Sequence, residues 1–157
     1  YLWDQGVWNE ICVPGRCTMF DNVIATIDNL HAAGEYLYAR FNTAGNRRTL
    51  ARWSAGNWTP LLDFGETLPN GAVANNYSIL DGNARGDALV QSNDGGSALM
   101  VVNETERRTI FSLIRPTEEG DLIRQIQSAE IRNDGRVYFV ALDYFDRLMC
   151  YVATPVQ

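Results

Sequence analysis

Several acidic side chains lie in the short polar segments that separate the apolar runs of this chain. Carboxylate oxygens ligate hard cations, and they also accept hydrogen bonds from hydroxyl groups, so a cation or a sugar binds where several of them converge. The segment Thr117-Glu118-Glu119-Gly120-Asp121 holds three such groups. We expect a ligand site formed by the linker residues Arg16, Asp21, Glu66, Glu118, Glu119 and Asp121. A solvated loop is the alternative, because only one linker carries several acids.

Residues for other chemistries are few. The only histidine, His31, occurs in L-H-A-A-G, and Asn83 occupies a similar place further along, so we interpret His31 as a turn residue rather than a general base. There is no G-x-S-x-G motif and no glycine-rich phosphate loop ending in Lys-Ser/Thr. The sequence therefore predicts no catalytic residue, no metal ligand and no cofactor.

Three cysteines, Cys12, Cys17 and Cys150, leave two interpretations open. In C-V-P-G-R-C a Pro-Gly turn separates the first two, so a short disulfide between them is sterically conceivable. The alternative is that all three are buried or isolated thiols. Without a C-x-x-C motif or a second histidine, a zinc site is not expected.

Charge and hydropathy exclude two classes of partner. The chain has 13 Lys and Arg against 19 Asp and Glu, a net charge of −6, which disfavours nucleic acid and anionic membranes. No apolar run approaches the roughly 20 residues that span a bilayer. The chain starts at Tyr1 without a secretory leader, and we expect a mature product or a piece of a longer chain.

An internal repeat of about fifty residues is the strongest signal in the sequence. Trp3 and Trp8 bracket Gly6 as Trp53 and Trp58 bracket Gly56, so the pattern W-x-x-G-x-W occurs twice. An independent series of turns ends at Gly34, Gly86 and Gly135 with nearly the same spacing. Tryptophans can stack on sugars, but their repeated place beside predicted strands favours packing.

Each repeat contains short β-rich runs separated by turn residues, which predicts an all-β fold. The expected strands are 23–28, 35–41, 49–53 and 58–64, then 77–80, 87–92, 98–102 and 108–114, then 127–131, 136–142 and 148–152. The run V-Y-F-V-A-L in the second strand of the third set is nearly all apolar, as expected of a strand covered on both faces. Residues 122–129 fit either a short helix or the beginning of a strand.

Four antiparallel strands repeated every forty to fifty residues are typical of β-propeller blades. The turn-plus-strand pattern also resembles the repeat of bacterial β-propellers, approximately I-N-x-x-G-x-V-x-F-x-A. Ile131, Asn133, Gly135, Val137 and Phe139 match it with one extra turn residue. The resemblance implies four-stranded antiparallel blades whose linkers gather at one mouth of a central tunnel.

The predicted organisation is one domain of about three blades. Residues 1–22 hold outer strands that close a blade, 23–73 and 74–123 are complete blades, and 124–157 supply three strands of a last blade. Three blades cannot close a ring, since propellers use about four to eight. We therefore expect either a homodimer, with two half-rings forming a six-bladed propeller, or further blades in a longer chain.

The resemblance implies a propeller-type binding module, extracellular or at the cell surface, that presents its tunnel-mouth loops to a glycan or protein. Two alternatives stay open. One is a propeller enzyme of the hydrolase or lyase type with a metal at the tunnel, and the other is a structural assembly unit without ligand. A convergent set of His, Asp and Glu would favour the enzyme, and this sequence holds few of them.

Overall fold

The computed structural model describes residues 2–4, 7–19, 22–69, 71, 73–92, 98–113, 116–118 and 120–155, with the backbone only at 2–4 and 7–9. All regular elements in these ranges are β-strands, and all strand pairs are antiparallel. The all-β prediction is therefore confirmed. In the same ranges there is no helix that could cross a membrane.

The strands form one hairpin and three sheets, each running in chain order. The hairpin joins β1 (Leu2–Asp4) and β2 (Val7–Asn9). The first sheet contains β3 (Thr18–Met19), β4 (Asn22–Ala33), β5 (Tyr36–Thr43), β6 (Arg48–Ser54) and β7 (Asn57–Asp63). The second contains β8 (Tyr77–Gly82), β9 (Ala88–Ser92), β10 (Ala98–Val102) and β11 (Arg107–Ser112). The third contains β12 (Ile123–Ile131), β13 (Val137–Asp143) and β14 (Leu148–Ala153).

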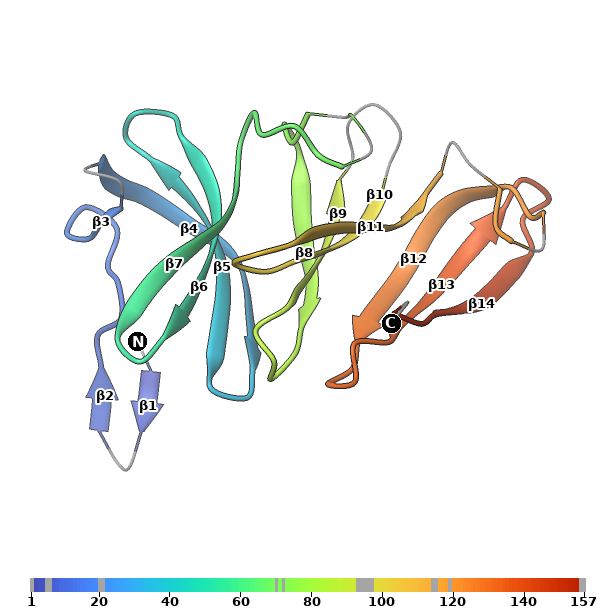
Figure 1. Ribbon diagram of the computed structural model, residues 1–157. Coiled ribbons are helices and arrows are strands. Elements are labelled where there is room, and N and C mark those ends of the chain that lie inside the picture. Colours follow the sequence, from blue (N-terminus) through green and yellow to red (C-terminus); the bar gives the residue numbers. More distant parts are fainter. Residues whose placement is uncertain are drawn as a thin grey trace.

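The three sheets follow one another in space as they do in the chain, with β4–β7 at one end and β12–β14 at the other (Figure 1). Strand β8 contacts β4 on one side and β12 on the other. Hydrogen bonds cross both contacts: Ile79 N–H donates to Asn29 Oδ1, and Ile131 N–H donates to Asp81 Oδ2 at 2.9 Å. Each bond joins residues 50 apart, so the sequence period is also the spacing between neighbouring sheets.

Apolar side chains fill the spaces between consecutive sheets. Between the first and second sheets, Tyr38 and Leu50 pack against Val90 and Met100. Between the second and third sheets, the cluster includes Leu89, Leu99, Val101, Val137 and Phe139. The second sheet is thus covered on both faces, and all five residues of β10 are buried. That burial explains its uninterrupted apolar sequence.

The repeated W-x-x-G-x-W pattern forms a β-hairpin in both copies. Trp3 pairs with Trp8 across β1 and β2, and Trp53 pairs with Trp58 across β6 and β7. In the second copy Ala55 and Gly56 have φ of 48° and 87°, as a two-residue hairpin turn with both φ values positive requires. The Trp58 ring packs edge-on against Phe41, with centroids 4.6 Å apart, so packing is confirmed for this tryptophan.

A buried polar cluster around Asn83 ties the three sheets together at one end. Its Nδ2 donates to Asp87 Oδ2 at 2.9 Å and to the Arg132 carbonyl of the third sheet at 3.1 Å. The Asn83 carbonyl accepts a bond of 2.9 Å from the hydroxyl of Tyr38, in the first sheet. Asn103 Nδ2 donates to the other Asp87 oxygen, at 2.9 Å. Asn83 is 2% exposed and Asp87 is 8% exposed, so water competes little for these bonds.

The burial of Tyr38 also affects its titration. Burial, as the largest cause, raises the pKa of the Tyr38 hydroxyl above its ordinary value, although the nearby Arg52 guanidinium acts in the opposite direction. The hydroxyl therefore stays protonated and remains a donor to the second sheet over the whole physiological pH range.

Three local expectations need correction. His31 lies inside β4, opposite Tyr38, rather than in a turn, because this hairpin turns later, at Gly34. Residues 123–129 belong to β12, so the helical alternative for 122–129 is wrong; the strand pairs with β13 through two bulges that accommodate its irregular pattern. The outer strands expected within residues 1–22 are short: β2 ends at Asn9, and β3 contains only Thr18 and Met19.

We predict that Gly135→Val destabilises the third sheet. Gly135 has φ of 85°, and a Cβ there would lie 3.1 Å from Pro155 Cγ. Left-handed backbone costs a residue with a Cβ about 1–2 kcal/mol, and the close contact adds to this. Thermal denaturation should show a clear fall in melting temperature for Gly135→Val and a smaller one for Gly135→Asn. An unchanged melting temperature for the valine variant would refute the turn assignment.

We also predict that Asn83→Ala costs about 2–3 kcal/mol of unfolding free energy, because it leaves buried groups without partners. Asn133→Ala is the matched control. Its Oδ1 accepts an exposed hydrogen bond from Ala84 N–H of the second sheet at 2.9 Å, so its loss should cost less than about 1 kcal/mol. Denaturant titration of both variants measures the difference, and equal losses would contradict the role given to Asn83.

Candidate functional site

The predicted acidic site is distributed over separate local networks. Arg16 and Glu118 are exposed, while Glu66 is half-buried and forms an ion pair with Arg107. Asp21 and Glu119 lie outside the described residues. In the part of the chain that is described, no three His, Cys, Asp or Glu side chains are arranged to hold a metal ion. A ligand site made of the whole predicted set remains a prediction.

Asp121 contacts two side chains of the last hairpin. Its Oδ2 accepts a hydrogen bond of 3.1 Å from the Tyr151 hydroxyl, and its Oδ1 lies 3.9 Å from Arg147 Nη2. Arg147 also forms a closer pair with Asp143, with Nε 2.6 Å from Oδ2. The Asp121 carboxylate therefore belongs to a network that fixes the β13–β14 turn to the segment before β12.

The Asp143 carboxylate is the acceptor that organises this turn. Burial by itself would raise its pKa, but hydrogen bonds from Arg147 N–H, from the Arg147 side chain and from Phe145 N–H outweigh that effect. The pKa of Asp143 consequently lies below its ordinary value. The two backbone bonds are 2.9 Å from Arg147 and 2.8 Å from Phe145, so the ionised carboxylate holds the turn closed.

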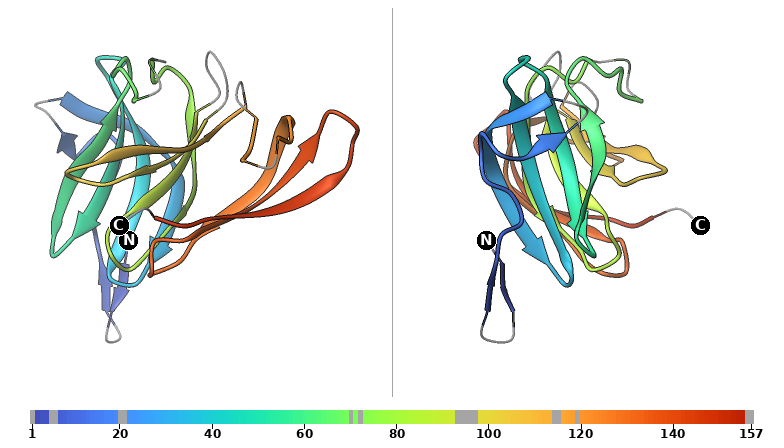
Figure 2. Two further views of the ribbon diagram at one scale, coloured as in Figure 1. Left: turned by 45° about the vertical axis from the view of Figure 1, so that its right-hand side comes forward. Right: turned by 90° about the vertical axis from the view of Figure 1, so that its left-hand side faces the viewer.

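The outer face of the third sheet carries exposed apolar side chains. We call it the open face and define it by side chains that the register places on one side of β12, β13 and β14: Ser128, Glu130, Tyr138, Val140, Leu142, Leu148, Cys150 and Val152. Leu148 is 64% exposed and Val152 is 56% exposed. The third sheet ends the row of sheets, and its opposite face packs on the second sheet (Figures 1 and 2).

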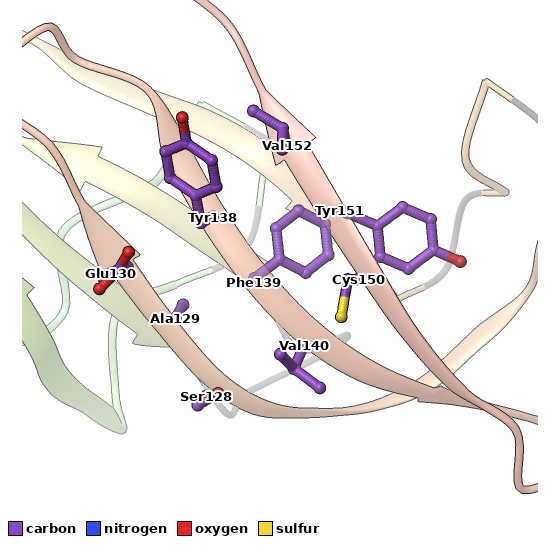
Figure 3. A pocket seen from close by; sticks show the side chains of 9 residues that line it. All are labelled: Ser128, Ala129, Glu130, Tyr138, Phe139, Val140, Cys150, Tyr151 and Val152. Carbon is purple, nitrogen blue, oxygen red and sulfur yellow. The ribbon is translucent and has the colours of Figure 1, made fainter.

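A groove of about 370 Å³ runs along the open face, and Figure 3 shows the side chains that line it. Tyr138, Val140 and Val152 give it an apolar floor, with Ser128 and Glu130 along β12. The rings of Phe139 and Tyr151 stack on the opposite face, 5.1 Å apart and inclined by 21°, and support the sheet from the buried side. The groove suits an apolar partner surface, and the thiol of Cys150 is exposed in it.

The pattern of burial along β13 shows that no second layer covers the open face. The residues of Val137–Asp143 alternate strictly between buried and half-buried, so only one face of this strand is covered. Its apolar sequence predicts cover on both faces, like that of β10, which is buried throughout. The surface therefore has the composition of a sheet interior without the second layer.

Sequence reasoning identified the apolar character of this strand but not its exposure. Alternation of side chains is visible in V-Y-F-V-A-L, yet which neighbour covers each face depends on distant segments. The sequence signal for the open face is that Val140 and Val152 are apolar and lie on the same side of the sheet as Tyr138. The acidic linkers drew attention to a different part of the molecule.

Comparisons of this chain with protein-family models, curated proteins and solved structures found no match.

We predict that Asp143→Asn weakens the fold in a pH-dependent way. A folded-state pKa below the unfolded value means that the carboxylate stabilises the fold above about pH 4 and that this contribution disappears as the pH falls through the folded pKa. The melting temperature of the variant should thus lie below that of the original chain at neutral pH, and the gap should close in acid.

Asp146→Asn is the control, since Asp146 belongs to the same turn but its side chain is 71% exposed, in an ion pair with Arg124. The difference in melting temperature between Asp146→Asn and the original chain should be small at every pH. Melting curves recorded from neutral pH to about pH 3 make the comparison. A gap for Asp143→Asn that persists unchanged in acid would show that the carboxylate charge is not what stabilises the turn.

Proposed function

We propose that this chain is a propeller-type interaction module whose open face is covered by a second copy of the same chain. The observation that carries the proposal is the burial of β13, an almost wholly apolar strand with one covered face. Covering a Val or Leu side chain contributes about 1.5–3 kcal/mol, so several exposed ones provide a driving force for association. Large contiguous apolar surfaces on soluble proteins mark such interaction sites.

The register of the sheets supports this choice of occupant. Leu89 pairs with Val101 on the face of the second sheet that the third sheet covers. Tyr138 pairs with Val152 at the corresponding place in the third sheet, on the open face. Leu89 and Val101 are buried under the next sheet, whereas Val152 is exposed. The open face thus continues the stacking surface already used within the chain, and a sheet of the same kind fits it best.

The N-terminal hairpin supplies a second argument. β1 and β2 form a separate two-stranded sheet, and the hairpin extends away from the three sheets in every view (Figures 1 and 2). In the first sheet β7 pairs with β6, and in the second sheet β11 pairs with β10. Among the described residues, no strand pairs with β14 on the side away from β13. A hairpin from a second copy would add to the free edge of β14 by backbone hydrogen bonds.

Two copies related by a twofold axis would each cover the open face of the other and each add a hairpin to the other's β14, because such an interface uses the same surfaces twice. The result would be a dimer of two three-sheet units whose open faces cover each other. A six-bladed ring would also need the outer face of the first sheet, which Cys12 and Met19 cover. In this proposal the dimer presents the linkers between its sheets to a glycan or a protein, as expected from the resemblance to propeller repeats.

We predict that the chain associates to about twice its mass of 17.6 kDa at micromolar concentrations. Val152→Asp should shift this equilibrium to the monomer, because it places an unpaired charge on the open face. Sedimentation equilibrium over a range of concentrations measures both. Leu30→Asp is the control: Leu30 is an exposed apolar residue, 62% accessible, on β4 of the first sheet, and its replacement should leave the dimer intact.

Two results would overturn the proposal. A wild-type monomer at every concentration would assign the open face to a different occupant, such as a further sheet of a longer chain. A dimer that Val152→Asp and Leu30→Asp leave equally stable would place the interface elsewhere. Melting curves of both variants verify that each remains folded.

A further inference from the structure

The outer face of the first sheet, unlike the open face, is covered by residues of the same chain. Cys12 and Met19 are buried there against Ile24, Ala39, Phe41 and Ala51, and Cys17 packs against the same cluster. The cover is the segment before β4, which contains the C-V-P-G-R-C sequence. We call residues 12–17 the cysteine loop.

Backbone hydrogen bonds define the conformation of the cysteine loop. The N–H groups of Arg16 and Cys17 both donate to the Val13 carbonyl, at 3.0 and 3.1 Å, and close a tight turn. The loop is also paired to β4, since Gly15 N–H donates to the Ile24 carbonyl at 2.8 Å and Ile24 N–H donates to the Cys17 carbonyl at 2.9 Å. These four bonds place the two cysteines at the two ends of one turn.

The Cys17 sulfur lies close to the backbone that follows Cys12. Val13 N–H donates to Cys17 Sγ at 3.0 Å, which brings this sulfur back beside the residue that follows Cys12. Burial, and next the hydrogen bond between the Cys12 and Cys17 thiols, raise the pKa of Cys12 to about 12. Cys12 is 8% exposed and Cys17 is half-buried, whereas Cys150 is exposed on the third sheet.

We infer that Cys12 and Cys17 form a reversible disulfide that closes the cysteine loop over the first sheet. The inference rests on the geometry of the turn and does not depend on the proposed assembly. Low-molecular-weight disulfides such as oxidised glutathione are the oxidant. A covalent link at this place holds Cys12 and Met19 against Ile24 and Phe41, and so secures the cover of an apolar sheet face.

The exchange balances as two successive displacements. The more accessible Cys17 thiolate attacks oxidised glutathione, its sulfur bonds to one glutathione sulfur, and the other leaves as a thiolate. Cys12 then loses its proton to water, attacks Cys17 Sγ and releases the second glutathione. Overall the two cysteines lose two protons and two electrons, and one oxidised glutathione becomes two reduced molecules. Because the pKa of Cys12 is raised, the second displacement accelerates as the pH increases above neutral.

We predict that incubation of the whole chain with oxidised glutathione forms the Cys12–Cys17 bond, while Cys150 does not pair with either cysteine. Alkylation of the remaining thiols, digestion and mass spectrometry should find a peptide holding both loop cysteines that has lost two hydrogen atoms. Reduction should reverse the change and lower the melting temperature by several degrees. The variant Cys150→Ser should respond in the same way.

The double variant Cys12→Ser/Cys17→Ser is the matched control, and its melting temperature should not respond to the redox buffer. Separate alkylation or separate glutathionylation of Cys12 and Cys17 under oxidising conditions would overturn the inference. A bond from either loop cysteine to Cys150 would do so as well. If the double variant does not fold, the mass of the loop peptide from the unaltered chain decides the question alone.

Discussion

The hydrogen-bonded cluster of Asn83 and Asp87 is the interaction on which the arrangement of the sheets depends. Tyr38 reaches it from the first sheet, and the Arg132 carbonyl reaches it from the third. Both sheets are therefore tied to the same turn of the second sheet, and buried polar groups of this kind tolerate few alternative geometries. Strands β4, β8 and β12 lie side by side as a consequence, and the apolar clusters fill the space between the sheets.

Stacked sheets impose a second constraint, since each apolar face needs a cover. The second sheet has a neighbour on both sides, and the first sheet has the cysteine loop and Met19 over its outer face. The third sheet has the same kind of residues without a cover. This asymmetry connects the proposed assembly with the inferred disulfide: one end of the row is closed by the chain itself, and the other is available to a partner. The exposed groove with Val140 and Val152 lies at that available end.

Much of the fold could be predicted from local patterns. The spacing of Trp3 and Trp53 indicates the period that reappears in the two hydrogen bonds between sheets, which Ile79 N–H donates to Asn29 and Ile131 N–H donates to Asp81. Gly135 marks a turn because its backbone conformation excludes most other residues. His31 was assigned to a turn incorrectly, since the pairing with Tyr38 extends β4 beyond the point that its own residues indicate. The surroundings of the candidate ligand residues could not be predicted from local patterns, because Glu66 and Asp121 are paired with Arg107 and Arg147 from distant segments.

Strands, turns and the alternation of apolar side chains follow from local sequence, because they depend on residues close together in the chain. Which faces are covered follows from the packing of distant segments. V-Y-F-V-A-L has the composition of a strand between two layers, and the fold supplies one of them. A Pro-Gly turn sequence separates Cys12 from Cys17, but the packing of both on the cluster of Ile24 and Phe41 comes from the placement of that turn on β4 and β5. Cover is a property of segments that meet across the fold, so no local pattern specifies it.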